Sequence, residues 1–428
     1  GGYATKSYLK VKNEEAYANV FVTHFPDEER TEARPLRTAP CYDRLRALGA
    51  VFGQKFGWER ANWFAPIGVE PKVRYSFQKQ NWAPCVAKEV RACRGNVAIF
   101  DQSTFAKLLV QGADACEILQ HLCGANVDVP VGSSVYTGML NERGTYESDL
   151  TLVRLQQDEY YLITATTQAV RDHDWISRHL PADADAQLTD ITAALGVVSV
   201  MGPNARQLLS RVTSTDVSHE VFPFGTAQEL VIDDCRVRAL RLSYVGELGW
   251  ELHAPFSSIP RIYYALIEAG SDLALTHAGH YAINAMRLEK AYRAWGHELS
   301  TDETPLEAGL GFTLDWQTDF QGKQALLEQK TQGIRKRLLA FTLEDPETTL
   351  WGSEPIHRNG KLAGYTTSAA FSPTLGRAVA LGYVRLPDDG ITNRELLECP
   401  FEIVNNGQAY KALPSITSPY DPERSKMT

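Results

Sequence analysis

The feature that most limits the folds open to this 428-residue chain is the recurrence of strand–turn–strand segments between helices. One such segment is Tyr136–Leu152, in which Asn141–Gly144 has the composition of a hairpin turn. Another is Leu242–His253, which the pattern predicts to form strand, turn and strand. A hairpin joins antiparallel strands, whereas a doubly wound sheet is built from parallel ones. The sequence therefore predicts an α+β fold with antiparallel sheets.

The length favours two or three domains, and the pattern divides the chain into three regions. Residues 1–65 form an opening block, in which Thr5 is expected to cap a first helix and residues 42–52 to form a second. Residues 66–335 mix short strands with helices. Residues 336–428 contain strand-like runs separated by Pro, Gly and Asp turns, which predicts a small β-barrel.

Composition disfavours several classes of function. The formal net charge of −9 argues against a nucleic-acid surface, because binding phosphates needs concentrated positive charge. No apolar run reaches the ~20 residues that cross a bilayer, so no membrane partner is expected. The seven cysteines contain no C-x-x-C pair, which favours reduced thiols inside a cell. We therefore expect a cytoplasmic protein, or one of the mitochondrial matrix if its source is eukaryotic.

Motifs for common cofactors and metals are weak. The nearest match to a dinucleotide fingerprint, Gly309–Gly311, lacks a third glycine and a preceding strand, and there is no Walker-type loop. A flavin or nicotinamide domain is therefore not expected in this chain. His277 and His280 have a spacing that could hold a metal, but no third ligand accompanies them. A structural role is favoured for both, and no metal site is predicted.

Two acidic segments carry the residues best suited to chemistry. Leu242–His253 combines Glu247 and Glu251 with two aromatic rings, and this mixture suits a planar heterocycle that carries N–H donors. An ordinary hairpin with solvent-facing acids is an equally open alternative. In Tyr136–Leu152, alternation places Asp149 among weakly polar neighbours, where burial would raise its pKa. Asp149 is thus a candidate acid or base, and a solvated Asp at a strand end is the alternative.

Several short motifs follow one another along the chain: Asn141–Gly144 with Ser148–Leu150, Tyr244–Glu247, Arg287–Glu289, Thr304–Glu307, Gly322–Lys323 and Ser372–Leu375. Together they resemble the folate-binding family that includes the glycine-cleavage T-protein, an aminomethyltransferase. Four more segments are similar to the C-terminal half of dimethylglycine and sarcosine dehydrogenases and oxidases: Pro40–Leu45, Phe56–Arg60, Asn62–Pro66 and Phe100–Lys107. The resemblance implies a T-protein-like cloverleaf of antiparallel sheets and helices around a central folate cavity, ending in a small β-barrel.

The sequence departs from the family pattern in three ways. The flavin-binding half that precedes this region in those enzymes is absent, so FAD is expected only through a partner subunit or a missing N-terminal half. Thr145 replaces the usual second glycine of the turn, and Ser148 replaces the first of two paired aspartates. The Lys-Gly-Cys signature of the iron–sulfur-assembly branch is also absent, which disfavours that branch.

The resemblance also implies roles for seven residues. Asp149 would be the catalytic residue, beside the folate nitrogens that take the one-carbon unit. Glu251 would bind the pterin, with Glu247 as second choice. The other implied contacts are rings from Tyr136 and Tyr244, a bond from Arg287 to a ligand carbonyl or carboxylate, and an aromatic contact from Trp295. Alternatively, Arg287 and Glu289 form a plain helical ion pair.

Three functions are compatible with the resemblance. The first is tetrahydrofolate-dependent transfer, in which the methyl-derived carbon of an N-methyl amine of the dimethylglycine or sarcosine type, or of its imine, forms 5,10-methylenetetrahydrofolate. A flavoprotein partner would then supply the oxidation. The second is a free-standing tetrahydrofolate-dependent demethylase or methyltransferase, and the third is a non-catalytic folate-binding subunit. Asp149 favours the two enzymes, and the opening block favours the first of them.

Overall fold

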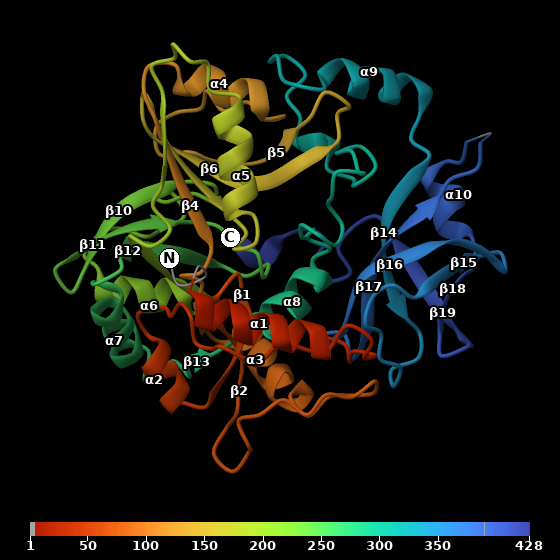
Figure 1. Cartoon of the computed structure of the whole chain (residues 1–428), viewed down its shortest axis with the longest axis horizontal. Helices are drawn as coiled ribbons and strands as arrows, with labels where there is room; N and C mark the ends of the chain where they lie inside the picture. Colours follow the sequence, from red (N-terminus) through yellow and green to blue (C-terminus); the bar gives the residue numbers. More distant parts are fainter. Residues whose placement is uncertain (1–4, 389) are drawn as a thin grey trace.

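The computed structural model describes residues 5–388 and 390–428. Three lobes surround a common centre (Figure 1), namely a five-stranded sheet, a six-stranded sheet and a closed six-stranded barrel. Almost all strand pairs are antiparallel, and helices cover the sheets. The predicted α+β fold with antiparallel sheets is therefore confirmed. Among the helices of the described ranges, none combines the length and apolar composition needed to cross a membrane.

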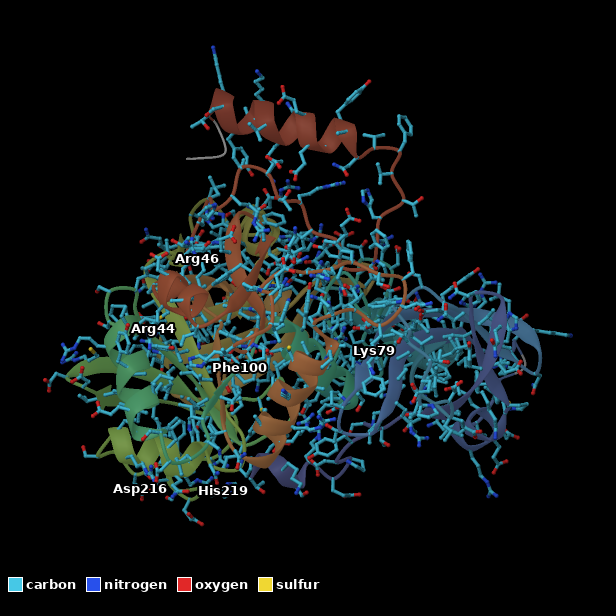
Figure 2. All side chains as sticks on the ribbon, turned by 90° about the horizontal axis from the view of Figure 1, so that it is seen from below. Arg44, Arg46, Lys79, Phe100, Asp216 and His219 are labelled. Atoms are coloured by element: carbon cyan, nitrogen blue, oxygen red, sulfur yellow. The ribbon has the colours of Figure 1, made fainter. Side chains whose placement is uncertain are left out.

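The opening region holds two helices and a two-stranded hairpin. Thr5 caps α1 (Lys6–Ala18), because its Oγ1 accepts a hydrogen bond from the backbone N–H of Tyr8 at 3.3 Å. No residue of α1 is buried, and Figure 2 shows this helix at one edge of the molecule, apart from the sheets. The other elements are α2 (Tyr42–Ala47), β1 (Ala50–Lys55) and β2 (Trp58–Phe64).

The predicted helix over residues 42–52 is wrong beyond Ala47. Gly49 takes a φ of +90°, a backbone conformation that residues with a Cβ rarely adopt, and this ends the helical path. The chain then enters β1, where Ala50 pairs with Phe64 of β2. Helical periodicity could not reveal this outcome, because the strand is stabilised by a partner outside the segment.

The six-stranded sheet has the order β10-β11-β12-β9-β3-β13. Its strands are β3 (Ala98–Asp101), β9 (Leu195–Met201), β10 (Ala227–Ile232), β11 (Cys235–Leu240), β12 (Gly249–Pro255) and β13 (Thr276–His277). Helices α6 (Ala205–Val212) and α7 (Ile259–Ala269) pack together on this sheet. Helices α3 (Ala83–Gly95) and α8 (His280–Glu289) contact each other and β2, so they join the sheet to the opening hairpin.

The five-stranded sheet has the order β5-β6-β7-β4-β8. Its elements are β4 (Ala106–Gln111), α4 (Ala115–Leu122), β5 (Ser134–Leu140), β6 (Tyr146–Gln156), β7 (Glu159–Thr164), α5 (Ala169–Arg178) and β8 (Gln187–Asp190). The predicted hairpin turn between β5 and β6 is confirmed. The backbone N–H of Asn141 donates to Thr145 O at 3.0 Å, and Gly144 takes a φ of +73°.

The C-terminal barrel closes in the order β14-β17-β16-β15-β18-β19, and it confirms the predicted small β-barrel. Its elements are β14 (Lys336–Leu343), β15 (Pro355–Arg358), β16 (Lys361–Ser372), β17 (Arg377–Arg385), α10 (Asn393–Glu398), β18 (Phe401–Asn405) and β19 (Gln408–Ser415). Two 3-10 turns, η2 (Gly311–Thr313) and η3 (Ser425–Met427), and α9 (Lys323–Gln332) complete the chain. Because α8 contacts β2, β16 and β17, it lies where the barrel meets the rest of the molecule.

Candidate active site

A cavity of about 1020 Å³ lies where the lobes meet. The five-stranded sheet, the six-stranded sheet, α8 and the barrel all contribute to its wall. Six of the seven predicted site residues line this cavity: Tyr136, Asp149, Tyr244, Glu251, Arg287 and Trp295. The fold thus brings together residues that are spread over more than a third of the sequence.

Asp149 lies on β6 opposite Gly138 of β5. Its Oδ2 accepts a hydrogen bond from the Tyr136 hydroxyl at 2.9 Å. Burial raises the pKa of Asp149 to about 6; the Tyr136 hydrogen bond opposes this rise, and the negative charge of Glu298 adds to it. The carboxyl group borders the cavity, so a ligand can reach it. A group with this pKa can take up a proton near neutral pH and release it again.

A second carboxyl group, Asp172 of α5, lies close to Asp149 but outside the cavity lining. Its Oδ2 accepts a hydrogen bond from Ser148, the neighbour of Asp149 on β6, at 2.9 Å. Burial raises the pKa of Asp172 to about 7, against hydrogen bonds from Thr164 and Ser148. Asp172 was not among the predicted residues, because no sequence pattern marks a carboxyl that reaches Ser148 from a later helix. Asp172 therefore places a second carboxyl beside Ser148, on the strand that carries Asp149.

Glu251 lies on β12, opposite Ser199 of β9. The Nε2 of His253 is 3.3 Å from Glu251 Oε2, and its Nδ1 is 2.9 Å from the Tyr161 hydroxyl. Burial lowers the pKa of His253, although the Glu251 carboxylate opposes this. A neutral His253 that accepts from Tyr161 can donate from Nε2, so these bonds hold the carboxylate in place. Within the described chain, the Glu251 carboxylate has one hydrogen-bond partner, His253, which contacts Oε2. Its other oxygen, Oε1, can therefore accept from a ligand in the cavity.

Four tyrosine rings line the same cavity: Tyr136, Tyr244, Tyr281 and Tyr292. The hydroxyl of Tyr244 donates to Arg293 O at 2.7 Å, which fixes its ring at the wall. Tyr292 stacks on Tyr244 with ring centroids 5.9 Å apart and planes 19° apart. Aromatic faces and an acid with an open acceptor together match the needs of a planar, N–H-rich heterocycle.

Glu247 does not line the cavity. The residue is 1% exposed, and its Oε1 lies 2.9 Å from Nη1 of Arg94. Arg94 also bonds Glu289 and stacks its guanidinium over the ring of Tyr420, 4.3 Å from the centroid. Gly246, with a φ of +76°, turns the backbone just before Glu247. In this position Glu247 forms a structural ion pair, and only Glu251 of the two acids faces the cavity where a pterin could bind.

Arg287 borders the cavity, yet its guanidinium is already bonded within the protein. It donates to Glu298 Oε2 at 2.7 Å, to Ser368 Oγ at 2.8 Å and to Asn284 Oδ1 at 2.9 Å. The alternative ion pair with Glu289 is not formed, because Glu289 accepts from Arg94. These bonds suit a residue that joins α8 to the barrel, and the predicted ligand bond stays untested.

Trp295 lies on the cavity wall, as its predicted ligand contact requires. The guanidinium of Arg171, from α5, lies over its ring, 5.7 Å from the centroid. A cation over one face of the indole leaves other parts of the ring for a ligand.

Comparison with known families decides the class of protein. The pattern of the GCVT N-terminal domain matches residues 41–318, and that of the glycine cleavage T-protein C-terminal barrel domain matches residues 336–421. The chain belongs to the glycine-cleavage T-protein family. In addition, the pattern of the FAD dependent oxidoreductase central domain matches residues 1–39. The family predicted from the motifs is thereby confirmed.

This T-protein family member is similar to three kinds of curated protein. Mitochondrial sarcosine dehydrogenase of Homo sapiens is 36% identical over 98% of the chain and 50% of its own length. Mitochondrial dimethylglycine dehydrogenase of Homo sapiens is 37% identical over 90% of the chain and 45% of its own length. An aminomethyltransferase of Halothermothrix orenii is 32% identical over 86% of the chain and its full length. The chain thus spans about half the length of the dehydrogenases.

A solved structure confirms the fold. The aminomethyltransferase T of the glycine cleavage system from Bartonella henselae superposes with a TM-score of 0.75 at 22% identity. The match covers 92% of this chain and 99% of that one, so the cloverleaf and the terminal barrel are shared.

The chain is therefore an aminomethyltransferase-type folate-dependent domain related to dimethylglycine and sarcosine dehydrogenases. Its cavity fits a folate in residue types, because Glu251 keeps one carboxylate oxygen for N–H donors and tyrosine rings line the wall. Among residues 5–388 and 390–428, no group of three His, Cys, Asp or Glu side chains could hold a metal ion.

Proposed function

We propose that this chain captures the methyl-derived carbon of an N-methyl amine, of the dimethylglycine or sarcosine type, as 5,10-methylenetetrahydrofolate. The observation that carries this proposal is one cavity bordered by both Asp149 and Glu251. The two acids differ in environment, since Asp149 is bonded to a neutral tyrosine and Glu251 to a histidine. This difference fits Asp149 for proton transfer and Glu251 for binding.

Glu251 is proposed to hold the pterin. The amino-pyrimidinone edge of a pterin offers adjacent N–H donors, which a carboxylate accepts in bidentate fashion. His253 and Tyr161 orient this carboxylate through the hydrogen bonds described above. Tyr136, Tyr244 and Trp295 would contact the pterin or the p-aminobenzoyl ring, and Arg287 would complete the wall or bond a ligand oxygen.

Asp149 is proposed to take a proton during transfer. Bound tetrahydrofolate supplies two amine nitrogens, N5 and N10, that together accept one carbon from an iminium ion. As the two new N–C bonds form and the C–N bond of the iminium breaks, two N–H protons must leave. One goes to the departing amine, and Asp149 accepts the other before passing it to water. Tyr136 holds Asp149 in position through its hydroxyl at 2.9 Å.

The oxidation that forms the iminium is proposed to take place on a flavoprotein partner or in a flavin-binding half that precedes this region. The match of residues 1–39 to an FAD dependent oxidoreductase central domain supports this, as does the coverage of about half of each dehydrogenase. The match of residues 1–39 also favours this function over a free-standing demethylase. A mitochondrial location, if the source is eukaryotic, belongs to the same proposal, because both human dehydrogenases are mitochondrial.

The proposed function can be tested with the purified chain. We would titrate it with tetrahydrofolate, then add formaldehyde or an N-methyl amine with its flavoprotein, and measure 5,10-methylenetetrahydrofolate. The expected result is folate binding and a transfer rate above that of the uncatalysed condensation. Absence of folate binding at about millimolar ligand, the weak end of useful affinity, would overturn the proposal.

A further inference from the structure

The cavity contains a second group of polar side chains, away from those assigned to folate. Lys55 of β1, Arg60 of β2, Gln102 after β3 and His280 at the start of α8 all line it. Neither Lys55 nor Arg60 forms an ion pair or a side-chain hydrogen bond within residues 5–388 and 390–428. The proposed function uses none of these four residues.

Three polar atoms in this group are buried without a partner: Arg60 Nε, Gln102 Oε1 and His280 Nε2. Gln102 is 6% exposed, so its side-chain amide has little contact with outside solvent. Buried polar groups of native proteins are nearly always hydrogen-bonded, and unsatisfied ones call for an explanation. All three residues line the cavity, so a small shift of their side chains would bring these atoms into contact with a ligand.

The fold holds these residues near one another. Gly279, just before His280, packs against the backbone of Asn62 in β2, which brings the start of α8 to the strand that carries Arg60. The His280 ring also bonds the backbone of Asp101, the residue before Gln102. The positive charges of both Arg60 and Lys55 act on His280. The four side chains therefore belong to one part of the cavity wall.

Two of these groups accept hydrogen bonds and two carry positive charge. Burial, with Arg60 and Lys55 nearby, keeps the pKa of His280 well below its ordinary value, so the imidazole is neutral. Its hydrogen bond to the Asp101 backbone uses Nδ1, because Nε2 has no partner, and this leaves Nε2 as an acceptor. Gln102 Oε1 is a second acceptor. Arg60 and Lys55 supply donors suited to a carboxylate.

Acidic side chains near Lys55 and Arg60 indicate whether this region suits a simple anion or a zwitterion as its ligand. Asp27 and Glu29 line the same part of the cavity as Lys55 and Arg60. Glu29 already accepts hydrogen bonds from Asn62 Nδ2 at 2.8 Å and from the backbone of Gln54. The two acids balance the two cations, so the region as a whole offers little attraction to an isolated anion. A small molecule with both a carboxylate and an N–H group matches it better.

We propose that Lys55, Arg60, Gln102 and His280 form a second binding site in the cavity for a small α-amino acid or its N-methyl derivative. The ligand carboxylate bonds Arg60 and Lys55, and its N–H groups bond His280 Nε2 and Gln102 Oε1. This inference rests on the proposed function, because it assigns the site to the amine whose carbon is transferred. The site retains that amine beside bound folate while the carbon moves.

Binding of N-methylglycine to the full chain, measured by titration calorimetry, tests the proposal. Acetate and methylamine are the comparison probes, because each fills one half of the site. N-methylglycine is expected to bind at least about tenfold more tightly than either, since each lost charge-assisted bond is worth about that factor. Acetate binding as tightly as N-methylglycine would overturn the zwitterion assignment.

Variants locate the site. Arg60→Gln and Lys55→Gln are each expected to weaken N-methylglycine binding about tenfold and to keep tetrahydrofolate affinity within about twofold. Arg46→Gln is the matched control, because Arg46 is an exposed arginine of α2 outside the cavity lining (Figure 2). Neither cation has an ion pair within the described residues, so its removal should not lower the melting temperature. If Arg60→Gln fails to fold, Lys55→Gln still tests the site.

Two results would overturn the second site. One is the absence of N-methylglycine binding to the unaltered chain at about 10 mM ligand. The other is unchanged binding in both cavity variants, or an equal loss in Arg46→Gln. Folate titration and methylenetetrahydrofolate formation are measured separately on the same samples. Loss of those signals with N-methylglycine binding intact would instead count against the proposed function.

Discussion

Asp149 can accept a proton only when it is ionised, and burial places its pKa at about 6. We therefore expect the rate of methylenetetrahydrofolate formation to rise with pH through about 6 and then to level off. Asp149→Asn should remove this inflection and lower turnover about 10²- to 10⁴-fold, with folate affinity kept within about threefold. A pH–rate profile of both proteins checks this, and unchanged transfer kinetics in the variant would refute the assignment.

Asp149→Asn should lower turnover without lowering stability. This difference distinguishes a loss of catalysis from a loss of folding. The pKa of folded Asp149 is raised above the ordinary 3.8, so protonation favours the fold. Stability should increase as the pH falls from about 6 towards 4, and Asp149→Asn should be at least as stable as the parent at neutral pH. Asp158→Asn is the control, because Asp158 is exposed on the adjoining turn. Thermal unfolding of the three proteins provides the comparison.

Glu251 and Glu247 follow the same turn, and the structure predicts opposite consequences for their loss. Glu251→Gln leaves one acceptor where the pterin needs two, so folate affinity should fall about 10- to 100-fold with stability retained. Glu247→Gln should keep folate affinity, but should lower the unfolding free energy by about 1–3 kcal/mol, because buried Arg94 loses one of two carboxylate partners. Folate titration and thermal unfolding of both variants measure these effects. Loss of folate affinity in Glu247→Gln, with affinity kept in Glu251→Gln, would contradict the assignment.

At the scale of elements, the short-range signals in the sequence were informative. The hairpin at Asn141–Gly144, the cap at Thr5 and the terminal barrel each depend on local turn or capping chemistry, and all three are present. Contacts between distant segments could not be predicted in this way. Asp172 meets Ser148 from a later helix, and His253 meets Tyr161 across two sheets. These contacts behind the cavity wall therefore could not be predicted from the sequence, whereas six of the residues predicted from the family motifs line the cavity.

The C-terminal segment after β19 is a further element whose role only the structure shows. Asp421 accepts a hydrogen bond from the buried ammonium of Lys290, 3.0 Å away, at the end of α8. Burial alone would raise the pKa of Asp421. Hydrogen bonds with Ser425 and Lys290 outweigh this effect and lower the pKa to about 2. The stability it contributes is thus present above about pH 4 and lost as the pH falls towards 2.

Asp421→Asn should therefore destabilise the chain at neutral pH by about 1–3 kcal/mol, because a buried ammonium loses its charged partner. Glu423→Gln is the control, because Glu423 is exposed on the same segment and forms no ion pair with the described residues. Denaturant unfolding at neutral pH measures both variants. A loss of the same size in Glu423→Gln would show that the segment, rather than the pair with Lys290, sets the stability.

At the scale of the whole molecule, the end of α1 and the residues just after it carry exposed apolar side chains. Tyr17 is 83% exposed and Phe21 is 96% exposed, and both lie within the region that matches an FAD dependent oxidoreductase central domain. Large apolar side chains that remain exposed together mark an interaction surface. The proposed flavin-binding partner or half would bury this surface and place the source of the iminium on the same molecule as the folate cavity.

This proposal predicts that substitutions at the end of α1 and in the residues just after it affect association and not folding. Tyr17→Ser combined with Phe21→Ser should leave the melting temperature of the isolated chain unchanged, because neither side chain is buried in it. The same pair should weaken binding to the flavoprotein at least about tenfold, since burial of a large apolar side chain contributes about 1.5–3 kcal/mol. Lys6→Ser, an exposed polar site on the same helix, is the control. Equal affinity of all three proteins for the flavoprotein would place the interface elsewhere.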